Sequence, residues 1–326
     1  MLGIEIPIVQ APMGGAVPAS LAAAVSNAGA LGTLPLWRAD LETLRDVVRK
    51  ARALTSKPFA VNLNMEFPQE DRLEVCLEEG VPVISFFWRD PGALVKRAKA
   101  GGARVFYTVG NADDARRAVD AGVDVVVAQG WEAGGHVRGT VATLPLVPAV
   151  VPVGEVPVIA AGGIADGRGM AAAMALGAAG VWVGTRFLAS EEVSIHPEYQ
   201  RRILAAGEND TAYCESLFDR GWANAPHRVL RNSTVRNWEA AGRPPSGQRP
   251  GEGEIVARSE SRGDVNRYMS FTPGPDTVGA IEPLSLWSGQ SVALVRKVQP
   301  AAEIVREINE EAGSILRRLG QQSSPH

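Results

Sequence analysis

Residues 80–130 read GVPVISFFWRDPGALVKRAKAGGARVFYTVGNADDARRAVDAGVDVVVAQG. Each of three apolar, β-rich runs in this stretch follows a polar amphipathic segment that stops at a glycine: Gly80, Gly101 and Gly122. Glycine is common directly after a helix because it adopts a positive φ without steric cost. The stretch therefore predicts helices that alternate with strands, with 21 residues from each of these glycines to the next.

Capping residues support the helices between these runs. Asp90 is expected to cap one helix with Pro91 at its first position, and Asn111 is expected to cap the next. A further helix is predicted over residues 40–54, where apolar side chains recur at helical spacing. The pattern is that of a repeated β–α unit.

The same alternation extends in both directions along the chain. Eight strands are predicted: Ile6–Ala11, Ala30–Leu34, Phe59–Leu63, Val81–Phe87, Arg104–Val109, Asp124–Gln129, Val156–Ala161 and Val181–Thr185. They are short apolar runs, typical of a parallel sheet buried on both faces. Eight such units in about 200 residues favour an α/β fold, a closed (β/α)8 TIM barrel. An open doubly wound sheet is the alternative, but the first turn, APMGGAVPAS, lacks the GxGxxG pattern.

The periodicity weakens after Ser190. Residues 242–254 read GRPPSGQRPGEGE, which predicts an irregular loop, and a helix is expected over Pro300–Leu319. We therefore expect a barrel with an inserted smaller helical and loop cap domain. The predicted divisions are a barrel over 1–190, a cap or lid over 191–274, and a C-terminal segment over 275–326 that returns to the barrel.

Composition narrows the class of protein. The 326 residues carry 33 basic and 36 acidic side chains, a net charge of −3, which argues against nucleic acid or an anionic membrane as the main partner. With only Cys76 and Cys214, and no HExxH or CxxC motif, neither a disulfide framework nor a metal site is predicted. No targeting segment or membrane span is expected, so a cytoplasmic location is the default.

Two glycine-rich segments follow the last two predicted strands. Gly162 and Gly163 come after the seventh strand, and Gly184 and Thr185 come after the eighth. Backbone N–H groups of glycine loops and helix N-termini bind phosphate, and this region of a TIM barrel is a recurrent phosphate site. The alternative is that the glycines only form tight turns.

Other candidates follow the sixth, first and third strands. Residues 128–139 read AQGWEAGGHVRG, so the glycines let the backbone approach a planar ligand and His136 reaches the barrel mouth as a general base or donor. The alternative for His136 is a histidine paired with local backbone. The remaining candidates are hydrogen-bonding or apolar ligand contacts: Ala11, Pro12, Met13, Asn62, Gln129, Gly134 and Gly135.

Six segments stand in this order along the chain: PIVQAPMGG (7–15), PFAVNLN (58–64), VVAQGWEAGGH (126–136), AAGGIADGRGMAAAMALGA (160–178), GTRFLAS (184–190) and LWSGQSVALV (286–295). Together they resemble the nitronate monooxygenase family of FMN-dependent TIM-barrel enzymes. The resemblance implies non-covalent FMN with its phosphate at the last two strand ends, and His136 as the active-site histidine. It also implies flavin contacts at Asn62, Gln129, Gly134, Gly163, Trp182, Val183, Gly184 and Thr185.

The activity that this resemblance implies is oxidation of alkyl nitronates by O2 to a carbonyl compound and nitrite, with a base needed for a neutral nitroalkane. Similar barrels include NAD(P)H-dependent flavin reductases acting on quinones or enoyl-acyl-carrier proteins, so NAD(P)H stays open as a partner. A non-catalytic flavin- or phosphate-binding barrel is the remote alternative. The partners expected are a small-molecule substrate and O2. The oligomeric state is left open, with a homodimer as one alternative.

Two features depart from the family pattern. Arg138 follows the histidine closely, in GHVRG, and residues 242–267 are longer and more polar than a usual cap. Arg138 is interpreted as a surface arginine, with an anionic substrate or a nucleotide phosphate as the alternative partner. Both features leave the choice of substrate open.

Overall fold

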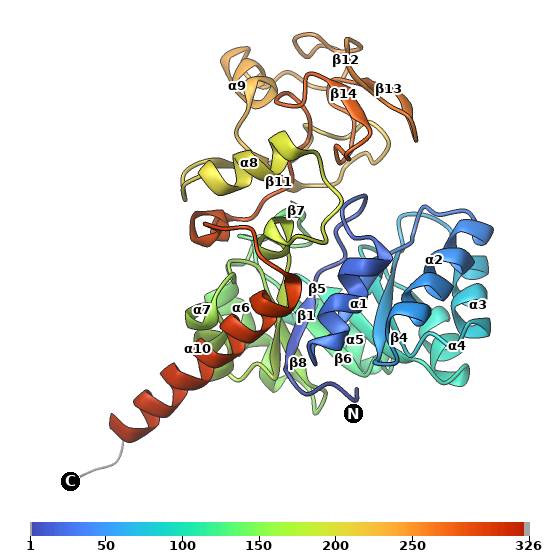
Figure 1. Cartoon of the computed structure of the whole chain (residues 1–326), viewed down its shortest axis with the longest axis vertical. Helices are drawn as coiled ribbons and strands as arrows, with labels where there is room; N and C mark the ends of the chain where they lie inside the picture. Colours follow the sequence, from blue (N-terminus) through green and yellow to red (C-terminus); the bar gives the residue numbers. More distant parts are fainter. Residues whose placement is uncertain (1, 323–326) are drawn as a thin grey trace.

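Eight parallel strands form the central sheet of the computed structural model, which describes residues 2–322 (Figure 1). The strands are β1 (Ile8–Gln10), β2 (Gly32–Pro35), β3 (Phe59–Asn64), β4 (Val83–Phe87), β5 (Arg104–Val109), β6 (Val125–Gln129), β8 (Val158–Ala161) and β9 (Gly180–Val183). Their order in the sheet is β1–β9–β8–β6–β5–β4–β3–β2. The ends of this order meet, because Gln10 N donates to Leu31 O at 2.9 Å and Leu31 N donates to Ile8 O at 3.0 Å. The predicted TIM barrel is confirmed.

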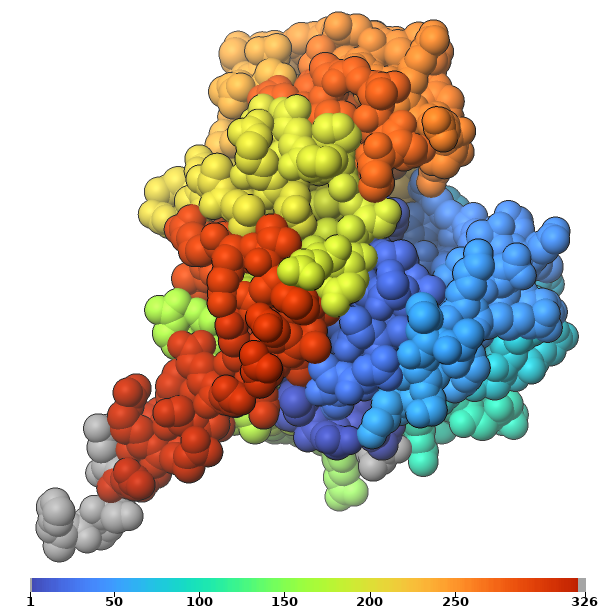
Figure 2. Space-filling view, in the orientation of Figure 1, coloured from blue at the N-terminus to red at the C-terminus, as the bar shows by residue number. Residues whose placement is uncertain are grey.

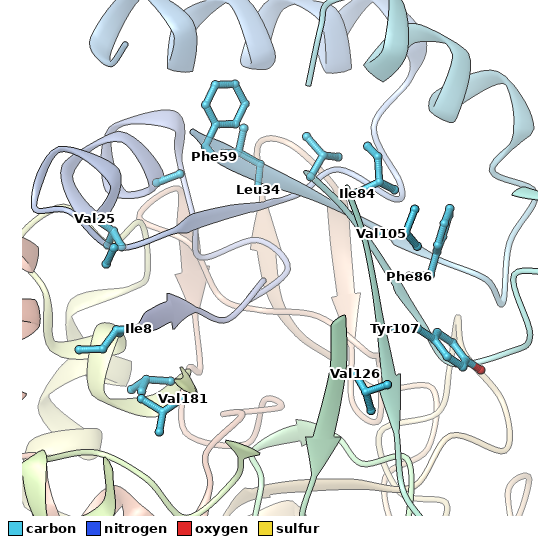
Figure 3. Close-up of a cluster of buried hydrophobic side chains, with 14 of the residues drawn as sticks. Ile8, Val25, Leu34, Phe59, Ile84, Phe86, Val105, Tyr107, Val126 and Val181 are labelled. Atoms are coloured by element: carbon cyan, nitrogen blue, oxygen red, sulfur yellow. The ribbon is translucent and has the colours of Figure 1, made fainter. Parts of the chain in front are cut away.

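The strands bury both faces, which explains their uninterrupted apolar sequences. In β5, Val105 and Tyr107 belong to the large cluster between sheet and helices, whereas Phe106 belongs to a second cluster inside the barrel. Figure 3 shows the outer layer, where Ile84 and Val181 lie among the labelled side chains. Because successive strand residues point to opposite faces, a strand buried on both sides needs apolar residues at nearly every position.

Helices connect the strands on the outside of the barrel. They are α1 (Ala19–Asn27), α2 (Leu41–Leu54), α3 (Glu70–Glu78), α4 (Leu94–Ala100), α5 (Ala112–Asp120), α6 (Thr143–Val150) and α7 (Gly167–Ala175), and the 3-10 turn η1 (Val151–Val153) follows α6. Asp40 caps α2 by accepting a hydrogen bond from Thr43 N at 2.8 Å. Asn111 caps α5 as predicted, accepting from Asp114 N at 2.8 Å.

One predicted cap is wrong. Helix α4 begins at Leu94, with Ala93 at the N-cap position, and not at Pro91. The carboxylate of Asp90 instead accepts a hydrogen bond from Gly92 N at 2.8 Å, within the turn that precedes the helix. A short polar side chain that pairs with backbone two residues ahead stabilises such a turn in place of a helix start.

Several boundaries also differ by one to two residues from the predictions, and two of them have a clear backbone cause. The left-handed residue after α4 is Gly102, with φ +87°, and not Gly101. Strand β9 ends at Val183 and not at Thr185, because Gly184 (φ −109°, ψ −77°) leaves the extended conformation. The 3-10 helix η2 (Thr185–Ala189) follows directly and turns the chain over the end of the barrel.

Between Ser190 and the C-terminal helix, the chain forms a second layer above the carboxyl ends of the strands, yellow to red in Figure 1. Its elements are α8 (Pro197–Ala205), β10 (Thr211–Cys214), β11 (His227–Leu230), α9 (Ser233–Ala240), β12 (Ile255–Ser259), β13 (Gly263–Asn266), β14 (Thr277–Gly279) and η3 (Gln290–Leu294). The expectation of helices and loops alone was wrong, because two small antiparallel sheets also form: β10–β11–β7 and β13–β12–β14. Residues 242–254 contain no helix or strand, as predicted.

The C-terminal helix α10 (Ala301–Gln322) packs against α7 and α1 of the barrel. The helix expected over Pro300–Leu319 therefore forms, but it begins one residue later and ends three residues later. The division into 1–190, 191–274 and 275–326 stays our proposal, and residues 1 and 323–326 lie outside the described part of the chain. Within residues 2–322, we find no helix with the length and apolar character that a membrane crossing requires.

Candidate active site

A cavity of about 780 Å³ opens at the carboxyl ends of the barrel strands and reaches up to the second layer. It collects nearly all of the residues singled out from the sequence: Ala11, Pro12, Met13, Asn62, Gln129, Gly134, Gly135, His136, Gly162, Gly163, Trp182, Gly184 and Thr185. Val183 does not line it, because this side chain packs on the outer face of β9. One cavity therefore joins loops from both halves of the barrel.

The position of His136 is set by a short strand, β7 (Gly135–His136), that leaves the barrel and pairs with β11. The side-chain amide of Gln129 stabilises this segment from the end of β6. Its Nε2 donates to His136 O at 3.1 Å, and its Oε1 accepts from Arg138 N at 2.7 Å. Gln129 therefore holds the histidine segment in place while it also lines the cavity.

Aromatic side chains surround the His136 ring. Trp222 stacks on it, with ring centroids 3.7 Å apart and planes 27° apart, and Trp287 lies 5.1 Å away. The His136 Nε2 atom is shielded from solvent and has no hydrogen-bond partner among residues 2–322. An orphaned buried nitrogen in a cavity wall is typical of an atom that meets a ligand.

Burial lowers the pKa of His136 well below its usual value, and His227 and Arg38 lower it further. The imidazole is therefore neutral near pH 7, and one ring nitrogen can accept a proton. A neutral histidine at a cavity wall has the protonation state that a general base needs.

His227 lies opposite His136 in the β7–β11 pair and is fully buried. Its Nε2 accepts from Phe218 N at 3.2 Å, which leaves Nδ1 to donate to Ala225 O at 2.8 Å. Burial lowers the pKa of His227 to about 4. Since both ring nitrogens are used, His227 supports the site and does not face a ligand.

The glycine segment after β8 forms a backbone cradle. Gly162 and Gly163 have φ values of +97° and +72°, which side chains rarely tolerate. A Cβ on Gly162 would lie 2.9 Å from Gly130 O, so no side chain fits there. Glu132 does not face the ligand space as an acid, because it accepts hydrogen bonds from Thr143 N and Thr143 Oγ1.

Thr185 and Asn62 are engaged in local hydrogen bonds. Thr185 Oγ1 accepts from Gly289 N at 3.0 Å and so ties η2 to the start of η3. Asn62 Nδ2 donates to Ser85 O at 3.1 Å, between neighbouring strands. At Gly134, a Cβ would lie 2.4 Å from Gly289 N, so only glycine permits this close packing of two loops.

Arg138 is neither a ligand residue nor a free surface arginine. Its guanidinium forms an ion pair with Asp114 at 3.3 Å, and it does not line the cavity. Asp114 is buried, and it also pairs with Arg117. The ion pair connects the histidine loop to α5, which explains an arginine so close to His136.

Sequence reasoning missed the aromatic wall and two cationic side chains of the cavity. The missed residues are Trp37, Arg38, Trp222, Arg262 and Trp287. They come from a barrel loop and from three segments of the second layer, and they follow no local pattern. Only Trp287 lies within a segment, 286–295, that carried the family resemblance.

Comparison with known proteins decides the family. The family model described as nitronate monooxygenase matches residues 1–71 and 63–311. The chain belongs to the nitronate monooxygenase family. Membership in this flavin-dependent family makes the protein an oxidoreductase of the nitronate monooxygenase type.

Relatives of this nitronate monooxygenase family member carry more than one name. A Mycobacterium tuberculosis protein named (3aS,4S,5R,7aS)-5-hydroxy-7a-methyl-1-oxo-octahydro-1H-indene-4-carboxyl-CoA dehydrogenase is 40% identical, over 74% of this chain and 68% of its own length. A nitronate monooxygenase from Paraburkholderia phytofirmans is 33% identical over 98% of this chain and 96% of its own. The structure of FabK from Thermotoga maritima superposes with a TM-score of 0.81 at 33% identity, covering 98% of this chain and 97% of the other.

Proposed function

We propose that this protein binds FMN and oxidises alkyl nitronates with O2 to a carbonyl compound and nitrite. The observation that carries the proposal is the shielded, unpartnered Nε2 of neutral His136, in a cavity that also holds the glycine cradle. The Paraburkholderia phytofirmans relative, which matches nearly the whole chain, supports the choice of nitronates.

The residues present fit a flavin mononucleotide. A volume of about 780 Å³ is within the range of small-molecule sites. The backbone at Gly163 and Gly184 would hold the phosphate, close to the N-terminus of α7, where partial positive charge favours anions. Pro12, Met13 and Trp182 would provide apolar contacts for the ring system.

When bound, FMN supplies a reversible electron acceptor for the oxidation. His136 has a separate task, which is to accept the α-proton of a neutral nitroalkane at its ring nitrogen. A substrate that is already a nitronate has lost this proton and needs only binding. Trp222 and Trp287 cover the histidine and exclude water from the reacting atoms. A small-molecule substrate, O2, a cytoplasmic location and a homodimer belong to this proposal.

Spectroscopy under anaerobic conditions tests the proposal. The purified protein should be yellow, should ignore NADH and NADPH, and should lose its flavin absorbance when an alkyl nitronate is added. In air the same mixture should release nitrite. A colourless protein that cannot be reconstituted with FMN, or a flavoprotein that nitronates leave unchanged, would contradict the proposal.

A second candidate function is NAD(P)H-dependent or thioester-directed redox chemistry on the same flavin. The name of the Mycobacterium tuberculosis relative, a carboxyl-CoA dehydrogenase at 40% identity, favours it. Rapid bleaching by NADH or NADPH in the same anaerobic experiment would select a reductase, with quinones and enoyl thioesters as the next substrates to test.

A further inference from the structure

Two arginines line the outer part of the cavity, far from each other in sequence. Arg38 follows β2 of the barrel, and Arg262 lies in the turn between β12 and β13. Neither side chain forms an ion pair with a carboxylate of residues 2–322. Figure 2 shows the surface indented where the orange segment that contains β12 and β13 overhangs the blue N-terminal part.

The Arg38 guanidinium is held in place before any ligand arrives. It lies over the Trp37 ring at 4.7 Å and over the Phe67 ring at 4.9 Å, and these two rings stack on each other. Its Nη2 donates to Gly221 O at 2.6 Å. A guanidinium has five N–H donors, so several stay available for an anion.

Two positive charges face the same space. Burial lowers the pKa of Arg38, and the charge of Arg262 lowers it further, because the two guanidinium groups repel each other. Asp276 is the acidic residue that lines this part of the cavity, but its Oδ2 accepts from Ser259 Oγ at 2.7 Å and from Ser261 N at 3.1 Å. That carboxylate holds the β12–β13 turn, and an external anion would offset the repulsion between the arginines.

This cationic pair is separate from the glycine cradle assigned to FMN. Arg38 follows β2, and in the barrel β1 and β9 stand between β2 and β8. Arg262 belongs to the second layer, whereas Gly163 and Gly184 belong to barrel loops. One flavin phosphate therefore does not account for both features.

We propose that Arg38 and Arg262 form an anion site at the cavity mouth that binds the diphosphate of a nucleotide-tailed ligand, with the ligand's other end directed toward His136. Guanidinium groups match phosphate oxygens in geometry and charge. A simple nitronate has no phosphate, so the inference goes beyond the proposed function. Coenzyme A thioesters and pyridine dinucleotides share this chemistry, and the name of the Mycobacterium tuberculosis relative points to the former.

Calorimetric titration of the full-length protein, with its flavin as isolated, tests the site. Coenzyme A and NADPH are titrated separately into the wild type, Arg38→Gln and Arg262→Gln. The matched control is Arg258→Gln, on the same hairpin, whose guanidinium pairs with Asp264 at 2.8 Å and does not line the cavity. We expect the Kd to rise about tenfold or more in each test variant and to stay unchanged in the control.

Each outcome bears on the inference. Arginine-dependent binding of coenzyme A alone identifies the thioester source, and that of NADPH alone identifies the dinucleotide source. Absence of binding of both up to about 1 mM, or a Kd that neither variant changes, overturns the site. Inorganic phosphate is titrated in the same way, and binding as tight as that of the nucleotides overturns the nucleotide assignment.

Two features keep this test interpretable. Arg262 is exposed, so Arg262→Gln decides the result even where Arg38→Gln disturbs the Gly221 loop. Because the titration measures binding and not turnover, a protein that oxidises nitronates but ignores both nucleotides rejects this inference alone. Nucleotide binding without nitronate oxidation rejects only the proposed function.

Discussion

The imidazole of His136 stacks on the indole of Trp222, with ring centroids 3.7 Å apart. Trp222 is itself buried, and its Nε1 has no hydrogen-bond partner in the described part of the chain. The two side chains lie 86 positions apart in sequence and come from different layers of the molecule. The contact covers the imidazole ring and contributes to the burial that lowers its pKa.

Replacing Trp222 should therefore change the titration of His136. In Trp222→Ala, water reaches the imidazole, and its pKa should rise toward the usual 6.5, because burial is the main cause of the present lowering. Titration of the histidine ring by NMR measures this shift. Trp222→Phe, which keeps an aromatic cover, is the matched control and should move the pKa less. An unchanged pKa in Trp222→Ala would show that other groups exclude the water.

Removing His136 should separate proton transfer from flavin binding. His136→Ala should retain flavin and lose roughly 10²–10⁴-fold in turnover of a neutral nitroalkane, because no base accepts the α-proton. Turnover of the preformed nitronate should fall much less. Steady-state rates with the two substrates at equal pH measure the difference. Equal losses on both substrates would show that the histidine binds the anion and does not act as a base.

Substitution of the glycine cradle should prevent flavin retention. Gly163→Asp adds strain at φ +72° and a negative charge where the FMN phosphate is proposed to lie. The ratio of flavin to protein absorbance after desalting measures the loss. Gly80→Asp is the matched control, since Gly80 has φ +65° and open space around a Cβ, far from the cavity. A Gly163→Asp protein with full flavin content would place the phosphate elsewhere.

Stability should fall in mild acid because of His227. Its folded pKa is about 4, against about 6.5 when unfolded, so the unfolded state binds more protons between these values. The free energy of unfolding should therefore decrease as the pH falls through this window, and His227 should account for about 3 kcal/mol of the decrease. Urea unfolding at several pH values measures the slope, which His227→Gln should reduce, with the remainder coming from His136, whose pKa burial also lowers.

Val229→Ala, which removes no titrating group from the same strand, serves as the control for that slope. It should shift the free energy of unfolding by a similar amount at every pH. A wild-type stability that is constant from pH 7 to about pH 4 would show that His227 is accessible to protons in the folded protein.

Local patterns were enough to predict the barrel and most of its helices. Asn111 capped its helix as expected, whereas Asp90 did not, because its side chain paired with Gly92 in a turn. Such competition between turn and helix depends on a few hydrogen bonds and is not visible in the spacing of apolar residues. The strands of the second layer were not predicted, because they are short and separated by loops, so they leave no periodic pattern in the sequence.

By itself, the sequence determined the barrel and the edge of the barrel where the site lies. Short apolar strands alternating with amphipathic helices require a parallel sheet, and parallel strands place all their carboxyl ends on one side. Tertiary structure alone decided that Trp222 covers His136, that Arg138 pairs with Asp114, and that Arg38 and Arg262, 224 positions apart in sequence, line one cavity. These contacts depend on how the second layer packs on the barrel, and no local periodicity encodes that packing.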